Sequence, residues 1–305
     1  MKGASAWRDL EPRDAIMRFV GRLQEELAWR RADGLDSSYL ALKYEGTLFR
    51  PGNGLNPLAV EGYAARLGPL VEAIRGFERP KLVDAGCGCG SEAILAALLG
   101  ADVTAVDIVG MRVDYARSRV PFYAASGPLG LRFVRANILS YLAENPGLDV
   151  VWANESVSHI HPVESFLRAV RAALKPGDLL LVADSNALNP AVRVKAARIR
   201  GSREWFVRRQ FPCLDDASHD DVAEERIFTV GAMKRMLRAA GFRVRRVEML
   251  GFLGSSFFPG SWQANEVLVA GMTASQAILK RIPLVRLAGS AVVFVAGRDE
   301  GRRPS

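Results

Sequence analysis

The stretch Lys81-Leu-Val-Asp-Ala-Gly-Cys-Gly-Cys-Gly-Ser-Glu92 decides the fold of this chain. Its first residues predict a short buried strand that ends in Asp84, and a helix is expected from about residue 92 to residue 99. Three alternate glycines connect the strand to the helix, namely Gly86, Gly88 and Gly90. Glycines let the backbone approach a ligand closely, and the first N–H groups of a helix can bind an anion. The stretch therefore predicts a binding site for a nucleotide-like cofactor.

The next predicted strand, residues 101–107, ends in a second acid, Asp107. A carboxylate at this position can accept hydrogen bonds from both hydroxyls of a ribose. The dinucleotide fingerprint G-x-G-x-x-G is not matched, because Ser91 stands where the third glycine would be. This mismatch disfavours an NAD-dependent oxidoreductase. The alternative interpretation is an ordinary turn between strand and helix, followed by an ordinary surface acid.

The pattern of two apolar residues followed by Asp84-Ala-Gly-Cys-Gly-Cys-Gly90 resembles motif I of the class I S-adenosylmethionine (SAM)-dependent methyltransferases. The resemblance implies SAM as cofactor, a transferase of class EC 2.1.1, and an α/β fold. This fold is a Rossmann-like sheet of seven strands, of which the last is antiparallel. The cofactor-binding residues implied in this chain are Asp84, Gly86, Cys87, Gly88, Gly90, Asp107, Ile108, Asn137, Ile138 and Asn154. For Asn137 and Ile138, the alternative is that they merely end the third strand.

A closer resemblance precedes the glycine stretch. Phe49-Arg-Pro51, followed by Leu55-Asn-Pro-Leu58, is similar to the segment before motif I in the O-methyltransferases of ubiquinone biosynthesis. In that family an arginine directly follows Asn-Pro-Leu and helps to hold the methionine part of the cofactor, whereas this chain has Ala59. Arg50 is an alternative source of a guanidinium, or it simply faces solvent. The resemblance covers about residues 44–185, so it supports cofactor and architecture better than acceptor.

The composition is that of an ordinary globular protein, with 305 residues, 24% charged and 49% apolar. The net charge of +8 is a weak indication of an acidic partner. Two of the three cysteines, Cys87 and Cys89, lie in the glycine stretch, where we expect small packing residues and no metal or redox role. A polar N-terminus and the absence of a run of about eighteen apolar residues predict a cytoplasmic protein.

Strands and helices are expected to alternate with short connections, which is typical of a doubly wound parallel sheet. The predicted later strands are residues 131–136, 148–153, 179–183, 242–250 and 290–296. The predicted organisation is a helical cap and loop over 1–78, a SAM-binding domain over 79–300 with an insertion at 184–227, and a tail over 301–305. Residues 13–31 of the cap place apolar side chains on one face of a helix.

The insertion carries many arginines between Arg193 and Arg209, interleaved with Trp205, Phe206 and Phe211. Three interpretations are open: a lid that recognises an anionic substrate, a basic amphipathic helix on an anionic membrane, or a solvated helix rich in arginine. A later apolar segment, 252–262, is expected to line an apolar pocket, touch lipid, or be buried against the sheet.

Polar residues follow the fourth predicted strand, from Asn154 to His161. In an open α/β sheet this end of a strand faces the ligand crevice. Methyl transfer to an oxygen needs a base for the hydroxyl proton, and His159 is the first candidate because the ordinary pKa of histidine lies near working pH. Alternatively, His159 only packs under the cofactor. Glu155 is the second catalytic candidate.

Glu155 and His159 also resemble part of a Glu-x-x-Glu-His arrangement in the ubiquinone-related enzymes, where a divalent metal is implicated. The second glutamate is replaced here by Ser158. Since two isolated ligands rarely hold a hard cation against water, no metal is predicted.

These patterns favour a SAM-dependent methyltransferase that acts on a small or lipid-like acceptor at oxygen, in the cytoplasm or peripherally at an anionic membrane. A nucleic-acid methyltransferase is disfavoured, because base-modifying enzymes usually carry Asn/Asp-Pro-Pro-Tyr/Phe where this chain has Asn154-Glu-Ser-Val157. A scaffold that binds SAM without catalysis is the other alternative. The sequence does not indicate an oligomeric state.

Overall fold

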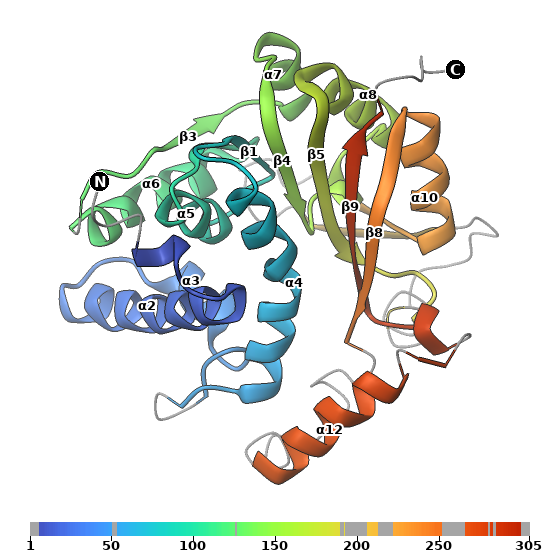
Figure 1. Ribbon diagram of the computed structural model, residues 1–305. Helices are drawn as coiled ribbons and strands as arrows, with labels where there is room; N and C mark the ends of the chain where they lie inside the picture. Colours follow the sequence, from blue (N-terminus) through green and yellow to red (C-terminus); the bar gives the residue numbers. More distant parts are fainter. Residues whose placement is uncertain are drawn as a thin grey trace.

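A seven-stranded sheet in the order β3-β2-β1-β4-β5-β9-β8 forms the centre of the computed structural model (Figure 1). The structure describes residues 6–50, 54–125, 127–189, 192, 206–212, 222–251, 266–279, 281–282 and 285–299. The strands of the sheet are β1 (Lys81–Ala85), β2 (Asp102–Asp107), β3 (Leu131–Arg135), β4 (Leu148–Asn154), β5 (Leu174–Ser185), β8 (Phe242–Leu250) and β9 (Ala291–Arg298).

The first five strands are parallel, and β9 lies antiparallel between β5 and β8. In this register Val83 pairs with Thr104 of β2 on one side and with Val151 of β4 on the other. The central strands are continuous apolar runs because both of their faces are covered. The predicted fold class, including the antiparallel last strand, is confirmed.

Helices cover both faces of the sheet, as expected for strands joined by right-handed crossovers. The helices that pack on one face are α4 (Pro57–Arg75), α5 (Ser91–Leu98) and α6 (Gly110–Ala124). Those on the other face are α7 (Ile138–Glu144), α8 (Val163–Ala173) and α10 (Val230–Ala239). Successive residues of β1 point to opposite faces of the sheet. Leu82 packs in the hydrophobic core under α4, α5 and α6, and Val83 packs in the core under α7, α8 and α10.

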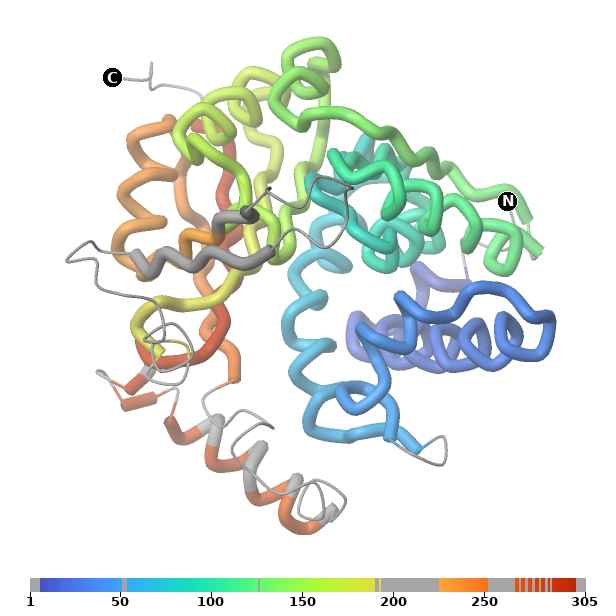
Figure 2. Tube along the Cα trace, turned by 180° about the vertical axis from the view of Figure 1, so that it is seen from behind, coloured from blue at the N-terminus to red at the C-terminus, as the bar shows by residue number. Residues whose placement is uncertain are grey.

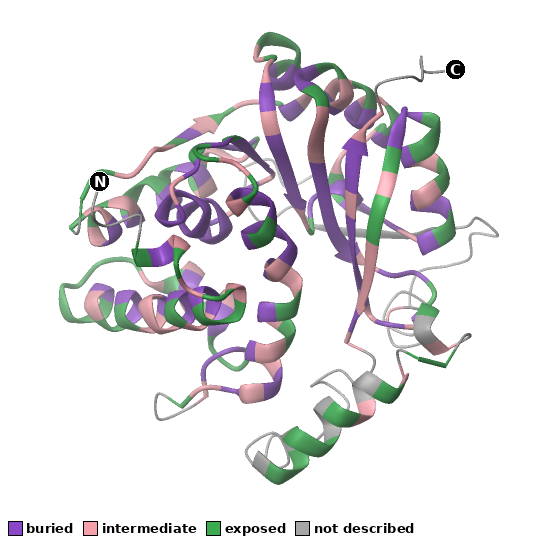
Figure 3. Ribbon diagram, viewed as in Figure 1, coloured by how far each residue is buried: buried purple, intermediate pink, exposed green. Residues whose placement is uncertain are grey.

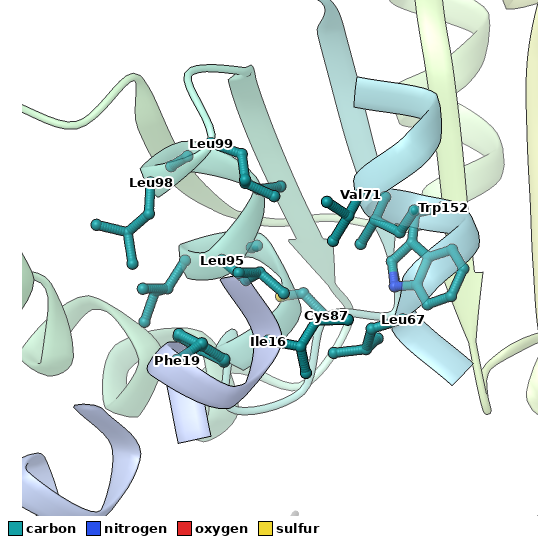
Figure 4. Close-up of a cluster of buried hydrophobic side chains, with 14 of the residues drawn as sticks. Ile16, Phe19, Leu67, Val71, Cys87, Leu95, Leu98, Leu99 and Trp152 are labelled. Atoms are coloured by element: carbon teal, nitrogen blue, oxygen red, sulfur yellow. The ribbon is translucent and has the colours of Figure 1, made fainter. Parts of the chain in front are cut away.

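The N-terminal extension is helical, with α2 (Pro12–Ala32) and α3 (Ser38–Tyr44) beside α5 and α6 (Figures 1 and 2). Ile16, Phe19 and Leu23 are fully buried, which follows the helical spacing of one apolar face. Ile16 and Phe19 point toward Leu95 of α5 (Figure 4). Burial of each such side chain stabilises the fold by about 1.5–3 kcal/mol. With α2 in place, α5 is buried along its whole length (Figure 3).

The described part of the insertion is a hairpin, in which β6 (Phe206–Pro212) pairs antiparallel with β7 (Val222–Phe228). Of the three interpretations of the insertion, the two helical ones are wrong for these residues, because Arg208, Arg209 and Phe211 lie in a strand. The lid interpretation stays a prediction. Arg193, Arg198, Arg200 and Arg203, Trp205 and the apolar segment 252–262 lie outside the described residues. Further along the chain, α12 (Glu266–Leu279) and a 3₁₀ turn, η3 (Val285–Leu287), precede β9. Among the described helices, none combines the length and the apolar character that crossing a membrane requires.

Candidate cofactor and acceptor site

A cavity of about 430 Å³ opens at the carboxyl ends of β1, β2 and β4. This is the edge of an open α/β sheet where ligands bind. The 3₁₀ turn η1 (Val157–His159), which follows β4, forms part of its wall. The lining residues are Gly86, Val106, Asp107, Ile108, Val109, Arg112, Ala136, Asn137, Ile138, Leu139, Glu155, Ser156, His159, Ile160 and His161.

The three glycines between β1 and α5 have positive φ angles, but they serve different purposes. A Cβ atom at Gly86 would lie 2.6 Å from Ser156 Cβ, and one at Gly90 would lie 2.5 Å from the Phe133 ring. These two glycines therefore let neighbouring elements approach the loop. A Cβ atom at Gly88 would meet nothing within 4 Å, so only this glycine faces open space.

Asp107 links the end of β2 to the glycine loop. Its Oδ2 accepts a hydrogen bond from the Gly88 N–H at 2.8 Å, and its Oδ1 accepts one from the Val109 N–H at 2.9 Å. A carboxylate has about four acceptor positions, so two remain for a ligand. The side chain is largely buried, yet it lines the cavity. Asp107 can therefore bind a pair of hydroxyl groups there without losing its contacts with the loop.

Apolar and amide groups line the cavity beyond Asp107. Ile108 is 63% exposed and Ile138 is buried, and both contribute to the lining. Asn137 caps α7, since its Oδ1 accepts a hydrogen bond from the Leu139 N–H at 2.8 Å. The sequence predicted a strand end at this position, and the structure adds the short helix that the prediction missed. This part of the cavity suits a flat, mostly apolar ring.

Asp84 lies buried at the end of β1, with 2% of its surface exposed. Burial raises its pKa well above the ordinary range, and the nearby Glu92 carboxylate raises this pKa further. Among the described residues, nothing donates a hydrogen bond to its Oδ2. A buried acceptor in this state is costly unless a donor reaches it. A cationic or N–H donor from a ligand would satisfy it.

A polar cluster from α3, α4, α5 and β4 lies next to the glycine loop. Asn154 accepts a hydrogen bond from Arg66 Nη1 at 3.4 Å and donates one to Glu92 Oε1 at 3.5 Å. Glu92 also receives the Lys43 ammonium at 3.5 Å and the Tyr63 hydroxyl at 3.3 Å. Asn154 is thus turned toward these side chains. It is absent from the cavity lining given above.

The predicted catalytic residues lie in the segment that follows β4: Glu155 comes before η1, and His159 is the last residue of η1. His159 is exposed and lines the cavity. Glu155, at a φ of 52°, forms an ion pair with Arg66, and this guanidinium lowers the pKa of the Glu155 carboxyl. Behind the turn, Asp184 Oδ2 accepts a hydrogen bond from the Ser158 N–H at 2.9 Å. Burial raises the pKa of Asp184 to about 7.

The structure brings most of the predicted site residues to one cavity, but not all of them. Seven line it: Gly86, Asp107, Ile108, Asn137, Ile138, Glu155 and His159. The five that are not part of the lining are Asp84, Cys87, Gly88, Gly90 and Asn154. Asp84 and Cys87 are buried below the loop, and burial raises the pKa of the Cys87 thiol, as expected of a packing residue. Within the described residues, no three His, Cys, Asp or Glu side chains are grouped to hold a metal.

Sequence reasoning missed the polar residues that surround the loop. Arg66 and Lys43 had no signal of their own, because the chain has 41 lysines and arginines and nothing in the sequence marks these two. Position 59 gave one indication of Arg66. Arg66 follows Ala59 by seven residues in α4, which places it about two turns further along the same helical face.

The fold and the position of the site define a class I, Rossmann-like methyltransferase. The family profile described as a methyltransferase domain matches residues 59–247, more than half of the chain. The chain therefore belongs to this methyltransferase family, and its cofactor is SAM.

Individual relatives agree with this assignment. The ubiquinone biosynthesis O-methyltransferase of Colwellia psychrerythraea is 29% identical over 142 residues, which cover 45% of this chain and 56% of the relative. With two further relatives, too, the chain spans only about half of the relative's length. The protein of the same name from Cereibacter sphaeroides (strain KD131) is 28% identical over 235 residues, covering 74% of this chain and 87% of the relative.

The fold is also found among solved structures. The magnesium protoporphyrin IX methyltransferase of Synechocystis PCC 6803, solved with bound S-adenosylhomocysteine (SAH), superposes with a TM-score of 0.51 at 14% identity. That alignment covers 79% of this chain and 85% of the other. At this identity the likeness concerns the fold alone.

Proposed function

We propose that the protein transfers a methyl group from SAM to a hydroxyl oxygen of a small or lipid-like acceptor. The observation that carries the proposal is one cavity shared by Asp107 and His159, with a diol-binding acid on one strand end and a base on a neighbouring turn. Its volume of about 430 Å³ lies in the ordinary range of small-molecule sites. The relatives named as ubiquinone O-methyltransferases support an oxygen acceptor.

The residues present fit the cofactor at its nucleoside end. Asp107 would hold the ribose hydroxyls with its remaining acceptor positions. Ile108 and Ile138 offer apolar surface to the adenine, and Asn137 offers an amide at the rim. The open space at Gly88 leaves room for the ligand beside the backbone.

The residues also fit the amino-acid end. The unsatisfied Oδ2 of Asp84 would accept a hydrogen bond from the ammonium group. Arg66 and Lys43 would supply the positive charge for the carboxylate, in place of the arginine that Ala59 replaces. Both cations already lie next to the glycine loop, on Asn154 and Glu92 respectively.

SAM supplies a methyl group on a sulfonium that leaves as a neutral thioether. The protein's main contribution is to hold the acceptor oxygen in line and to exclude water. His159 takes the hydroxyl proton at its imidazole. Glu155 is a weak base because Arg66 lowers the pKa of its carboxyl, so its role is to orient Arg66 at the crevice.

We further propose a cytoplasmic protein that touches an anionic membrane through the region of α12. Support comes from Ile278 and Ile282, which are 61% and 43% exposed, and from the exposed Arg281 between them. Cosedimentation with vesicles of phosphatidylglycerol, against vesicles of phosphatidylcholine, tests this. Equal recovery with both, or recovery unchanged in Ile278→Glu, would contradict it.

Calorimetry with SAH and with NAD, followed by incubation with methyl-labelled SAM and a panel of acceptors, tests the proposed function. The panel contains catechols, phenols with apolar tails, amines, RNA and DNA. We expect SAH to bind and NAD not to bind, with label appearing on a phenolic oxygen. Label on RNA or DNA would indicate the nucleic-acid alternative, and tight SAH binding without transfer to any acceptor would indicate a scaffold.

A further inference from the structure

A polar network with almost no contact to solvent lies behind the glycine loop. Glu26 of α2 and Arg119 of α6 are fully buried and form an ion pair at 2.8 Å. Arg119 Nε also donates to Glu26 Oε1 at 2.9 Å, and the Tyr123 hydroxyl donates to Glu26 Oε2 at 2.8 Å. The carboxylate is thereby saturated with donors, which fixes the orientation of the guanidinium.

The remaining nitrogen of this guanidinium, Nη1, contacts the glycine loop. Arg119 Nη1 donates to the Cys89 carbonyl at 2.5 Å and to Ser91 Oγ at 2.8 Å. Cys89 and Ser91 flank Gly90, the left-handed residue at the start of α5, which has no side-chain cap of its own. Arg119 therefore fixes the peptide planes at the point where the loop becomes a helix.

The loop is thus held from two sides. On the cavity side, Asp107 accepts the Gly88 N–H, and on the far side Arg119 donates to the Cys89 carbonyl one residue later. Removal of the second contact would leave a buried carbonyl unsatisfied and allow these peptide planes to rotate. The direction of the loop N–H groups toward a ligand would then no longer be defined.

We infer that Arg119, oriented by Glu26, is a positioning residue for SAM, and that α2 is in this sense part of the cofactor site although it lies outside the sheet. Neither residue belongs to the cavity lining, so they act through the loop. The inference rests on the proposed cofactor site at residues 86–90 and at Asp107.

If the ion pair of Glu26 and Arg119 only stabilised the fold, its removal should leave SAH affinity unchanged. Replacing a buried pair by apolar residues of similar volume is often neutral or stabilising. The test is therefore the triple variant Glu26→Leu, Arg119→Met, Tyr123→Phe, which removes the contacts of Arg119 as a unit. Buried Arg30, whose Nη1 lies 3.7 Å from Glu26 Oε1, loses this carboxylate but keeps its hydrogen bonds to the Asp36 carbonyl and to Ser118. Arg119→Lys is the second variant, because a lysine keeps the charge beside Glu26 but lacks the fork that also reaches Cys89 and Ser91.

Calorimetry with SAH, together with thermal unfolding of the same samples, gives the readout. We expect the triple variant to unfold within a few degrees of wild type and to bind SAH about tenfold more weakly. Arg119→Lys should bind with intermediate affinity and unfold a few degrees below wild type, because the Cys89 carbonyl loses its donor. Amide hydrogen exchange of the peptide containing residues 86–90 should be faster in both variants.

Two controls separate the possible failures. Arg31→Gln with Glu45→Gln removes an exposed ion pair of α2, at 2.8 Å, and should leave SAH affinity unchanged. Wild-type affinity in the triple variant, or in Arg119→Lys if the triple variant does not fold, would overturn the inference. If Asp107→Ala binds SAH as well as wild type does, the cofactor site itself is misplaced and the inference falls with it.

Discussion

The two halves of the crevice are built differently. The proposed cofactor half consists mainly of backbone groups and buried acids. These are the Gly88 N–H, the Asp107 carboxylate that accepts its hydrogen bond, and Asp84 below them. In the proposed acceptor half, the exposed side chains of Glu155, just before η1, and of His159, at the end of η1, line the same cavity. The first half is held by the contacts of Asp107 and Arg119 with the loop, whereas the second is held by the hydrogen bond between Ser158 and Asp184.

This difference indicates a division of labour. Under the proposed function, the cofactor, which is always the same, would be bound by groups that cannot change without disturbing the fold. The acceptor would contact side chains that can change without such a cost. Substitutions in the acceptor half should therefore alter turnover at constant stability, and those in the cofactor half should alter SAH affinity.

The largest effect is expected for His159→Asn. Loss of the base should lower kcat by about 10²–10⁴ with the best acceptor, while the affinity for SAH stays at the wild-type value. Only a neutral imidazole accepts a proton, so the wild-type rate should rise with pH through the titration of histidine, and the variant should lack this limb. A rise of the same size in the variant would assign the base to another group.

Asp107→Ala should have the next largest effect. The ribose would lose two hydrogen bonds to a charged acceptor, so calorimetry should show binding of SAH at least about 100-fold weaker. Asp114→Ala is the matched control, since this acid lies on the exposed side of α6 in a pair with Arg117. Equal weakening in both variants would mean that general charge, and no specific contact, governs affinity.

Gly88→Ala tests whether the open space at the loop belongs to the ligand. The φ of 53° makes alanine cost about 1–2 kcal/mol of stability, and the methyl group would occupy ligand space, so SAH should bind about tenfold more weakly. Gly62→Ala, at an uncrowded helical position of α4, should raise stability by about 0.5–1 kcal/mol and leave binding unchanged. Unchanged SAH affinity in Gly88→Ala would place the ligand elsewhere.

The smallest effect concerns Asp184, which supports the acceptor half. Its folded-state pKa of about 7 lies above the ordinary value of 3.8, so the folded protein retains a proton that the unfolded chain has lost. The favourable contribution of this proton to the free energy of unfolding is complete below about pH 4 and is lost as pH rises toward 7.

Relative to Asp184→Asn, wild type should thus lose stability between about pH 4 and pH 7 and stay level above this window. Thermal unfolding across this pH range measures the loss of stability. A change of 1 kcal/mol shifts the unfolding temperature by about 2–4 °C in proteins of about 150–250 residues. A difference between the two proteins that does not vary with pH would mean that Asp184 is ionised at neutral pH.

Much of the fold could be predicted from the sequence because its signals are local. Three alternate glycines between a strand and a helix specify the loop, and the sixth strand of the sheet, residues 242–250, was predicted with the bounds that the structure has. The hairpin of β6 and β7 was not predicted. Its arginines and aromatic residues follow neither the period of a strand nor that of a helix clearly enough to distinguish them.

The residues of the candidate site also differ in whether the sequence could predict them. Asp107 and His159 follow predicted strands, so the carboxyl-end rule for parallel sheets predicted their place in the crevice. Arg119 and Glu26 are 93 residues apart, and nothing in their surroundings in the sequence marks them as partners. Long-range contacts of buried charges depend on how α2 packs, which a single sequence does not specify.

The contact between Gly86 and Ser156 restricts how this crevice can evolve. Position 86 already carries the smallest residue, and a side chain there would collide with Ser156 at 2.6 Å. Ser156 lines the cavity with its Cβ atom close to Gly86, so position 86 has to stay glycine while the loop keeps its path. Changes of acceptor preference at the exposed neighbours Glu155 and His159 leave this seam between loop and turn undisturbed.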